Sequence, residues 1–215
     1  MSDGRIAITI ARQLGAGGVP LGRRLEKRLG FRYLDDEILR MAAEKLGARP
    51  EELARWDEHR SRFWERLAST FSLGSPEGMF EPAAGLGAAA VIQDREVFEL
   101  QAEVIREVTA KEDCIVIGRA GFWVLRDHPG RISVYLHAPV EARVPVVMGA
   151  FQLDAERARQ LIGQIDVDRA RFVRETTGKE VCVGNQDICV DTSRVALEVV
   201  EEMVVGMVEK RRGNH

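Results

Sequence analysis

The stretch ITIARQLGAGGVPLGRRLEKRLG, residues 8–30, decides how this chain is expected to fold. Its first residues are apolar and β-branched and are followed by glycines, which predicts a buried strand that ends in a tight turn. A proline then opens a helical pattern in which Leu21, Leu25 and Leu29 share one face, and Gly30 can end the helix. The stretch therefore predicts a strand, a glycine-rich turn and a helix in succession.

A turn of this kind can bind phosphate. Glycines allow backbone N–H groups to crowd around an anion, and the helix that follows adds the positive end of its dipole. A tight turn without a ligand is the alternative interpretation. The phosphate-binding hypothesis assigns the contacts to Arg12, Leu14, Gly15, Ala16, Gly17 and Gly18.

The turn departs from the nucleotide-binding pattern GxxxxGK[ST], the P-loop, at three positions. With Gly17 on the second glycine of the pattern, Arg12 stands on the first glycine, Gly18 on the lysine and Val19 on the Ser/Thr. The lysine normally brings a positive charge to the phosphates, and the hydroxyl binds Mg²⁺. Arg12 or Arg23 can replace the charge, since guanidinium groups bind phosphate oxygens. No residue of the turn replaces the hydroxyl.

Strand-like and helix-like patterns alternate along the rest of the chain. This alternation predicts an α/β fold, a parallel sheet flanked by helices, in which ligands bind at the carboxyl ends of the strands. We expect one domain over residues 1–215. Further strands are expected near residue 33 and within 113–118, 131–138 and 187–193, and helices over 94–111, over 141–175 and after a cap at Ser193.

Composition narrows the classes of protein to which the chain can belong. The formal net charge of −3 at pH 7 argues against a general nucleic-acid binder. The three cysteines form no CxxC pair, so the sequence predicts neither a zinc site nor a disulfide framework, and a reducing cytoplasm fits best. No stretch approaches the roughly 18 apolar residues of a membrane helix. We therefore expect a cytoplasmic protein without nucleic-acid or membrane partners.

Four further blocks carry a resemblance to a known family. They read VIGRAGFWVLRDHP (116–129), HAPVEARVPVVM (137–148), IDVDRARFVRETTGKE (165–180) and QDICVDTS (186–193). Together with residues 8–39 they resemble, in order, the blocks of the cytidylate kinase-like family, a branch of the P-loop nucleoside monophosphate kinases whose turn lacks the lysine. Gln186 stands where the family prefers tyrosine, and residues 72–90 match no block of the family.

The resemblance implies a P-loop kinase fold and an ATP-dependent phosphotransferase. The expected acceptor is a nucleoside monophosphate, CMP or dCMP by the family's name. ATP is the implied cofactor and Mg²⁺ is expected beside it, with no residue assigned as its ligand. The resemblance also implies a helical acceptor-binding insert from about residue 40 to 100 and an arginine-rich lid from about 150 to 180.

The acceptor site should lie beside the strand ends. Arg119 matches the family's Gly-Arg and is expected to bind the phosphate of the acceptor, with a surface arginine in a turn as the alternative. Asp35 and Asp36 follow a short extended segment and are expected to contact the acceptor. A helix cap is the alternative role for Asp36.

The predicted catalytic residues are Arg169, Arg143 and Arg119. Phosphoryl transfer depends on positioning and on neutralising charge, which arginines can do when a lid closes. Arg169 matches the family's D-x-x-R, and Asp166, three residues earlier on the same helical face, is its expected orienting partner. A solvated helix with surface salt bridges is the alternative interpretation.

Two other functions stay open beside the leading one. Residues 72–90 border the expected acceptor pocket, so the acceptor can be another small metabolite. Gly18 and Val19 stand where a P-loop has its lysine and its Ser/Thr, so both usual side chains are absent. A nucleotide-binding regulator without catalysis is therefore the other alternative.

Overall fold

The computed structural model describes residues 4–35, 38, 41, 88–181 and 183–213. Within these residues the central element is a sheet of five strands in the order β2-β3-β1-β4-β5. All neighbouring strands pair in parallel, and Ile8 lies beside Ile115 on one side and Ile132 on the other. The strands are β1 (Ala7–Arg12), β2 (Arg32–Leu34), β3 (Cys114–Ile117), β4 (Arg131–His137) and β5 (Ile188–Asp191).

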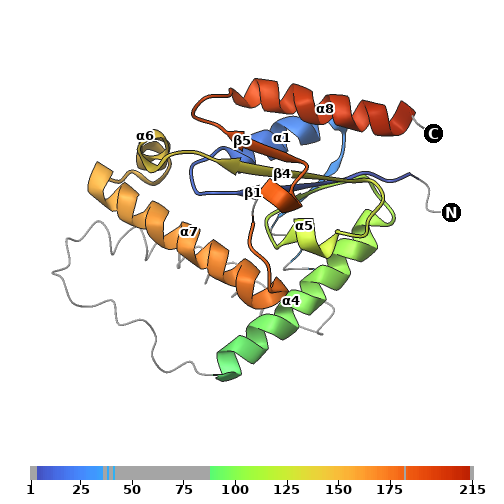
Figure 1. Ribbon diagram of the computed structural model, residues 1–215, viewed down its shortest axis with the longest axis horizontal. Helices are drawn as coiled ribbons and strands as arrows, with labels where there is room; N and C mark the ends of the chain where they lie inside the picture. The colour runs from blue at the N-terminus through green and yellow to red at the C-terminus, as the bar shows by residue number, and fades with distance from the viewer. Residues whose placement is uncertain (1–3, 36–37, 39–40, 42–87, 182, 214–215) are drawn as a thin grey trace.

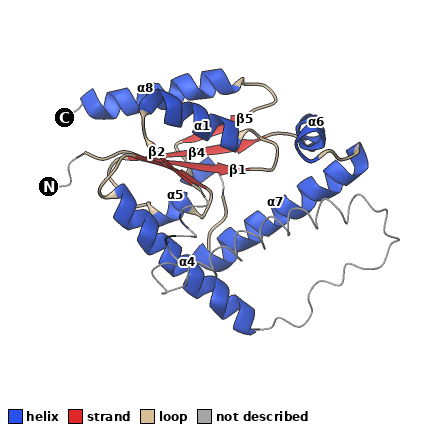
Figure 2. Cartoon of the chain, turned by 180° about the vertical axis from the view of Figure 1, so that it is seen from behind, coloured by secondary structure: helices blue, strands red, loops and turns tan. Residues whose placement is uncertain are grey.

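Helices cover both faces of the sheet (Figure 1), which confirms the α/β fold expected from the sequence. α1 (Gly18–Leu29) and α8 (Leu197–Gly213) lie together on one face. The other face carries α4 (Ala88–Thr109), α5 (Gly121–Val124) and the long helix α7 (Ala155–Thr177), as the view from behind also shows (Figure 2). α6 (Val140–Phe151) follows β4 and packs against α7.

Each face of the sheet has its own apolar core. Ile8 and Ile10 of β1 point toward α1 and α8, whereas Ala7 points toward α4 and α5. β1 is therefore buried on both faces, which explains its nearly continuous apolar sequence. Because all strands are parallel, their carboxyl ends meet at one edge of the sheet, where the glycine turn leaves β1.

Two helix boundaries differ from those expected. The region 141–175 holds two helices, because Gln152 adopts a left-handed conformation with φ 54° and ends α6. Asp154 then begins α7 as its cap, accepting a hydrogen bond from the Arg157 N–H at 2.9 Å. The expected cap at Ser193 was wrong: α8 begins at Leu197, and the Ser193 hydroxyl instead donates to the carboxylate at the end of β5.

Part of the predicted acceptor side cannot be placed. Residues 42–87 and Asp36 lie outside the described residues. Most of the predicted insert and most of the stretch 72–90 therefore lie outside them as well. Among the helices that the structure describes, none has the length and apolar character that spanning a bilayer requires.

Candidate active site

The glycine turn joins the carboxyl end of β1 to the beginning of α1. Gly15 and Gly17 have φ of 80° and 86°, a backbone region that favours glycine. The N-terminus of α1 has no side-chain cap and no acidic residue in its first turn. Within the described part of the chain, the N–H groups of Gly15, Gly17 and Gly18 make no hydrogen bond. The turn thus offers unpaired donors at a positive helix end, an arrangement that binds phosphate.

Close packing also requires glycine in this turn. A Cβ on Gly15 would lie 3.0 Å from Val147 Cγ2 of α6, and a Cβ on Gly17 would lie 2.8 Å from Leu197 Cδ1 of α8. Both distances are at or below the closest approach of real Cβ atoms. The two helices therefore fix the turn by direct contact, and a side chain at either glycine would displace it.

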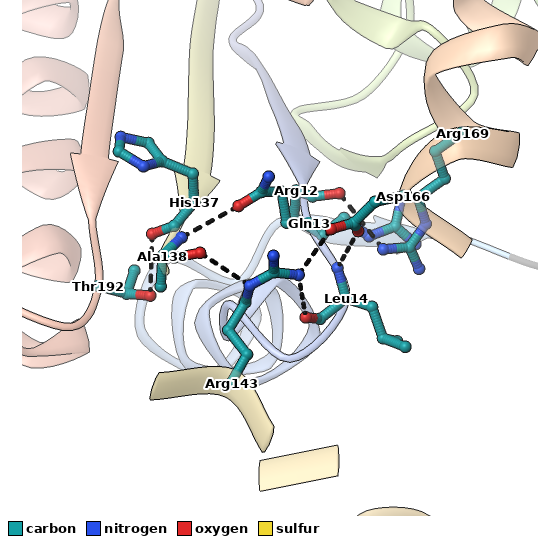
Figure 3. Close-up of polar contacts among 9 residues, drawn as sticks. All are labelled: Arg12, Gln13, Leu14, His137, Ala138, Arg143, Asp166, Arg169 and Thr192. Carbon is teal, nitrogen blue, oxygen red and sulfur yellow. Dashed lines mark hydrogen bonds and ion pairs between the residues drawn. The ribbon is translucent and has the colours of Figure 1, made fainter. Parts of the chain in front are cut away.

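A buried ion pair holds the turn from the opposite side (Figure 3). Asp166 Oδ1 of α7 accepts a hydrogen bond from Leu14 N–H at 2.8 Å, and Asp166 Oδ2 pairs with Arg143 Nη1 of α6 at 2.6 Å. Arg143 is 3% exposed and also donates to the carbonyls of Leu14 and Ala138 at 3.0 and 2.8 Å. These two side chains bind both backbone polar groups of Leu14 and so set the shape of the turn.

A cavity of about 540 Å³ opens next to the turn, at the carboxyl ends of the strands. Its volume lies within the range of about 300–1,000 Å³ that is typical of small-molecule sites. Apolar side chains of α5 and α7, among them Phe122 and Phe172, form part of the wall. The polar lining residues are Thr9, Arg12, Gln13, Asp35, Arg119, Tyr135, Asp166, Asp168, Arg169 and Glu180.

Two guanidinium groups come close together in this cavity. Arg169 Nη1 donates to the Arg12 carbonyl at 3.3 Å (Figure 3). Burial, and next the positive charge of Arg12, lower the pKa of Arg169 to about 10, so that Arg169 still carries its charge at pH 7. Burial also lowers the pKa of Arg12, against the attraction of Asp35. Like charges held together out of water favour the binding of an anion between them.

The third arginine of the cavity lies in a strained turn. Gly118, Arg119 and Ala120, between β3 and α5, have φ of 70°, 52° and 49°. A left-handed conformation costs a residue other than glycine about 1–2 kcal/mol. Such strain persists where the surrounding structure imposes it, and it is common at active sites. Here it places Arg119 in the wall of the cavity.

The cavity unites predicted site residues from separate parts of the sequence. Arg12, Asp35, Arg119 and Arg169 all line it. Arg143 and the predicted phosphate-binding residues 14–18 are not among the lining residues. Arg23, the other candidate for the missing lysine charge, is exposed: its guanidinium lies 3.7 Å from the centre of the Tyr33 ring and it pairs with Glu26 at 2.9 Å.

The role of Asp166 was not foreseen. The sequence predicted that it orients Arg169, whereas its hydrogen bonds go to Leu14 and Arg143. Helical spacing gave no signal for this, since Leu14 is 152 residues away. Tyr135 was also missed, although the alternation of β4 contains the signal: the buried Ile132, Val134 and Leu136 share one face, which puts Tyr135 on the other, where the cavity lies.

The carboxylates of the cavity determine how Mg²⁺ could be held. Within the described residues no group of three or more acidic, His or Cys side chains gathers to bind a metal. Kinase sites do not need one, because Mg²⁺ binds there through one or two carboxylates together with phosphate oxygens. Asp166 is engaged with the turn, and the other carboxylates that line the cavity are Asp35, Asp168 and Glu180. These residues fit an ion that arrives with the nucleotide.

The comparison with protein families is decisive for the assignment. The model of the cytidylate kinase-like family matches residues 7–194. The chain belongs to the cytidylate kinase-like family. Membership in this family supports a kinase-type phosphotransferase. The comparison with curated proteins gives no match.

Solved structures agree with the P-loop kinase fold of this cytidylate kinase-like chain. An uncharacterized protein from Eubacterium ventriosum is 18% identical with a TM-score of 0.68, covering 96% of this chain and 99% of that one. Shikimate kinase from Bacteroides thetaiotaomicron is 14% identical with a TM-score of 0.50 and coverage of 95% and 98%. A gluconokinase from Sinorhizobium meliloti is 13% identical with a TM-score of 0.50 and coverage of 98% and 95%. At these identities the likeness shows the fold.

Proposed function

We propose that this member of the cytidylate kinase-like family is an ATP-dependent phosphotransferase that acts on a nucleoside monophosphate, with CMP and dCMP as the first candidates. One observation carries the proposal: within the described residues the N–H groups of Gly15, Gly17 and Gly18 make no hydrogen bond, and their turn directly follows Arg12 and Gln13, which line a cavity together with Arg169. Polyphosphate donors need such amides, and a transferring phosphoryl group needs such cations.

In this proposal the donor triphosphate binds to the turn through the N–H groups of Gly15, Gly17 and Gly18. Leu14 takes no part through its own N–H, which Asp166 already binds. Arg12 and Arg169 neutralise the charge that develops on the transferring group. Residues 150–180 then act as the lid, because they include α7 and so bring Arg169 to the cavity. Bound Mg²⁺, held by Asp35 or Asp168 with the phosphates, would add further neutralisation.

The acceptor is assigned to the cavity. Arg119 lies in its wall and is proposed to bind the acceptor's phosphate, with Asp35 close by to receive a hydroxyl or amino group. The aromatic rings of Phe122 and Phe172 offer apolar surface to a flat base. The insert over about residues 40–100 would complete this side of the site.

We assign Arg143 as a positioning residue. Its side chain is 3% exposed, and its Nε and Nη1 groups donate to Ala138, Leu14 and Asp166. It therefore acts on the phosphates through the backbone of the turn rather than by contact. We also place the protein in the cytoplasm, which suits a chain whose three cysteines form no CxxC pair.

The test is ADP formation from ATP and Mg²⁺ in the presence of each common nucleoside monophosphate. CMP or dCMP should stimulate ADP release most, and Arg119→Ala should weaken the response to the acceptor. Arg171→Ala is the matched control, because Arg171 lies on α7 but is exposed, and among the described residues its ion-pair partner is Asp168, at 3.3 Å. Absence of turnover with every monophosphate would refute the proposal.

The same panel separates the alternative functions. Val19, at the hydroxyl position of the pattern, is 46% exposed and offers no ligand to Mg²⁺, which favours a regulator that binds ATP without transferring phosphate. A regulator would be stabilised against heat by ATP and would form no ADP. A kinase of another metabolite would form ADP from ATP when that metabolite is added in place of a nucleoside monophosphate.

A further inference from the structure

The side chain of Arg12 runs between two glycines. A Cβ on Gly18 would lie 2.7 Å from Arg12 Cγ, 3.0 Å from Arg12 Cβ and 3.2 Å from Arg12 Cδ. A Cβ on Gly118 would lie 2.2 Å from Arg12 Nη1. The stem of Arg12 thus fills the side-chain space of Gly18, and its guanidinium fills that of Gly118.

Gly18 is the stricter of these two positions. The Nη1 atom is the far end of a flexible side chain and can turn away from Gly118, whereas Arg12 Cβ is fixed by its own backbone. The backbone of Gly18 gives no reason for glycine, since its φ is not positive and it begins an ordinary helix. Gly18 is therefore glycine because Arg12 occupies the space beside it.

Arg12 has a charge that the described protein leaves without a close partner. Among the described residues, no carboxylate lies within the 4.0 Å of an ion pair with Arg12; Asp35 attracts it from farther away. Arg12 lines the cavity, and its neighbour Arg169 is also positive. A guanidinium held in this way is ready for an anion.

We propose that Arg12 supplies the charge that a lysine at position 18 supplies in an ordinary P-loop, and that the two side chains exclude each other. The inference rests on the proposed function, because the anion is the polyphosphate of ATP. The charge has moved from the first residue of the helix to the last residue of the preceding strand. Arginine at position 12 therefore requires glycine at position 18. In GxxxxGK the lysine stands at the second of these positions and glycine stands at the first.

Two single variants and their double variant, compared with wild type, test whether a lysine at position 18 can replace the arginine at position 12. Arg12→Gly removes the charge, Gly18→Lys adds the lysine beside Arg12, and the double variant recreates GxxxxGK over residues 12–18. Arg12→Gly should weaken binding of ATP, and of inorganic tripolyphosphate, by about 10-fold or more, as expected for a lost charged hydrogen bond. Gly18→Lys alone should lower both Tm and affinity. The double variant should recover most of both.

Arg12→Met tests the charge without the risk that Arg12→Gly fails to fold, because methionine keeps an unbranched side chain and removes only the charge. It should keep the wild-type Tm and bind ATP about 10-fold more weakly or worse. Equal ATP affinity of wild type and Arg12→Met would overturn the charge assignment. So would a double variant no better than the poorer single variant.

A second cycle measures the steric part without nucleotide. Gly18→Ala should lower Tm when Arg12 is present and should leave or raise Tm in the Arg12→Gly background, where the space is free. Equal effects in both backgrounds would overturn the coupling. If wild type binds neither ATP nor tripolyphosphate, the proposed function fails as well; if wild type binds and Arg12→Met binds equally, the inference alone fails.

Discussion

Replacing Asp166 with alanine removes the carboxylate that links the glycine turn to Arg143. Arg143 is 3% exposed, so the change leaves a buried charge without its partner, and Leu14 loses a 2.8 Å hydrogen bond. Breaking a buried ion pair costs about 3–5 kcal/mol. The Asp166 side chain is 19% exposed, so water partly compensates and we expect the lower end, about 3 kcal/mol.

The assay is thermal unfolding. In a chain of 215 residues, each kcal/mol lowers Tm by about 2–4 °C, so Asp166→Ala should lower Tm by about 6–12 °C. Asp168→Asn is the matched control on the same helix, because its partner Arg171 is 59% exposed and the pair should be worth less than about 1 kcal/mol.

Two further Tm measurements, one at high salt and one on a conservative variant, test whether the buried ion pair causes the loss. The loss in Asp166→Ala should persist at high salt, since buried pairs are little screened. Asp166→Asn keeps an oxygen for Leu14 N–H but loses the charge beside Arg143, so its Tm should lie between those of wild type and Asp166→Ala. Equal Tm values for Asp166→Ala and Asp168→Asn would contradict the role given to the buried pair.

The remaining predictions concern the cavity, the turn and Tyr33. Arg169→Ala should lower kcat by about 100-fold, as loss of a transition-state contact does, while Arg171→Ala changes it by less than about twofold; similar kcat values would contradict the role of Arg169. Gly17→Ala should destabilise the protein by at least about 2 kcal/mol in denaturant unfolding, because it forces a left-handed residue against Leu197; a wild-type midpoint would refute this. Burial raises the pKa of Tyr33 to about 12 from 10.0, so the folded state keeps a proton that the unfolded state loses, and the free energy of unfolding should fall as pH rises from 10.0 to about 12. Tyr33→Phe should remove part of that fall.

Much of the sheet could be predicted because each strand carries its own local signal. The segments around β3 and β4 are short, apolar and β-branched, and each lies within a stretch expected as a strand. The joint between α6 and α7 was missed, because Gln152 gives no glycine signal although it adopts the left-handed conformation that ends α6.

The candidate site was predictable where sequence order alone brings residues to the strand ends. Arg12 ends β1 and Arg119 lies two residues after the end of β3, so their place in the cavity follows from parallel pairing. The bond from Asp166 to Leu14 depends on how α7 crosses the sheet edge, which no local pattern encodes. The contact of Arg12 with Gly18 likewise appears only in three dimensions.

Asp166 and Arg169 lie one helical turn apart on α7, and they face two different tasks. Asp166 holds the backbone of the turn that we propose to bind ATP, and Arg169 lies in the cavity that we propose for the acceptor. A ligand that shifts this one helix must therefore alter both binding steps together. Thermodynamic reciprocity then requires that whatever factor the second substrate applies to ATP affinity, ATP applies to the second substrate.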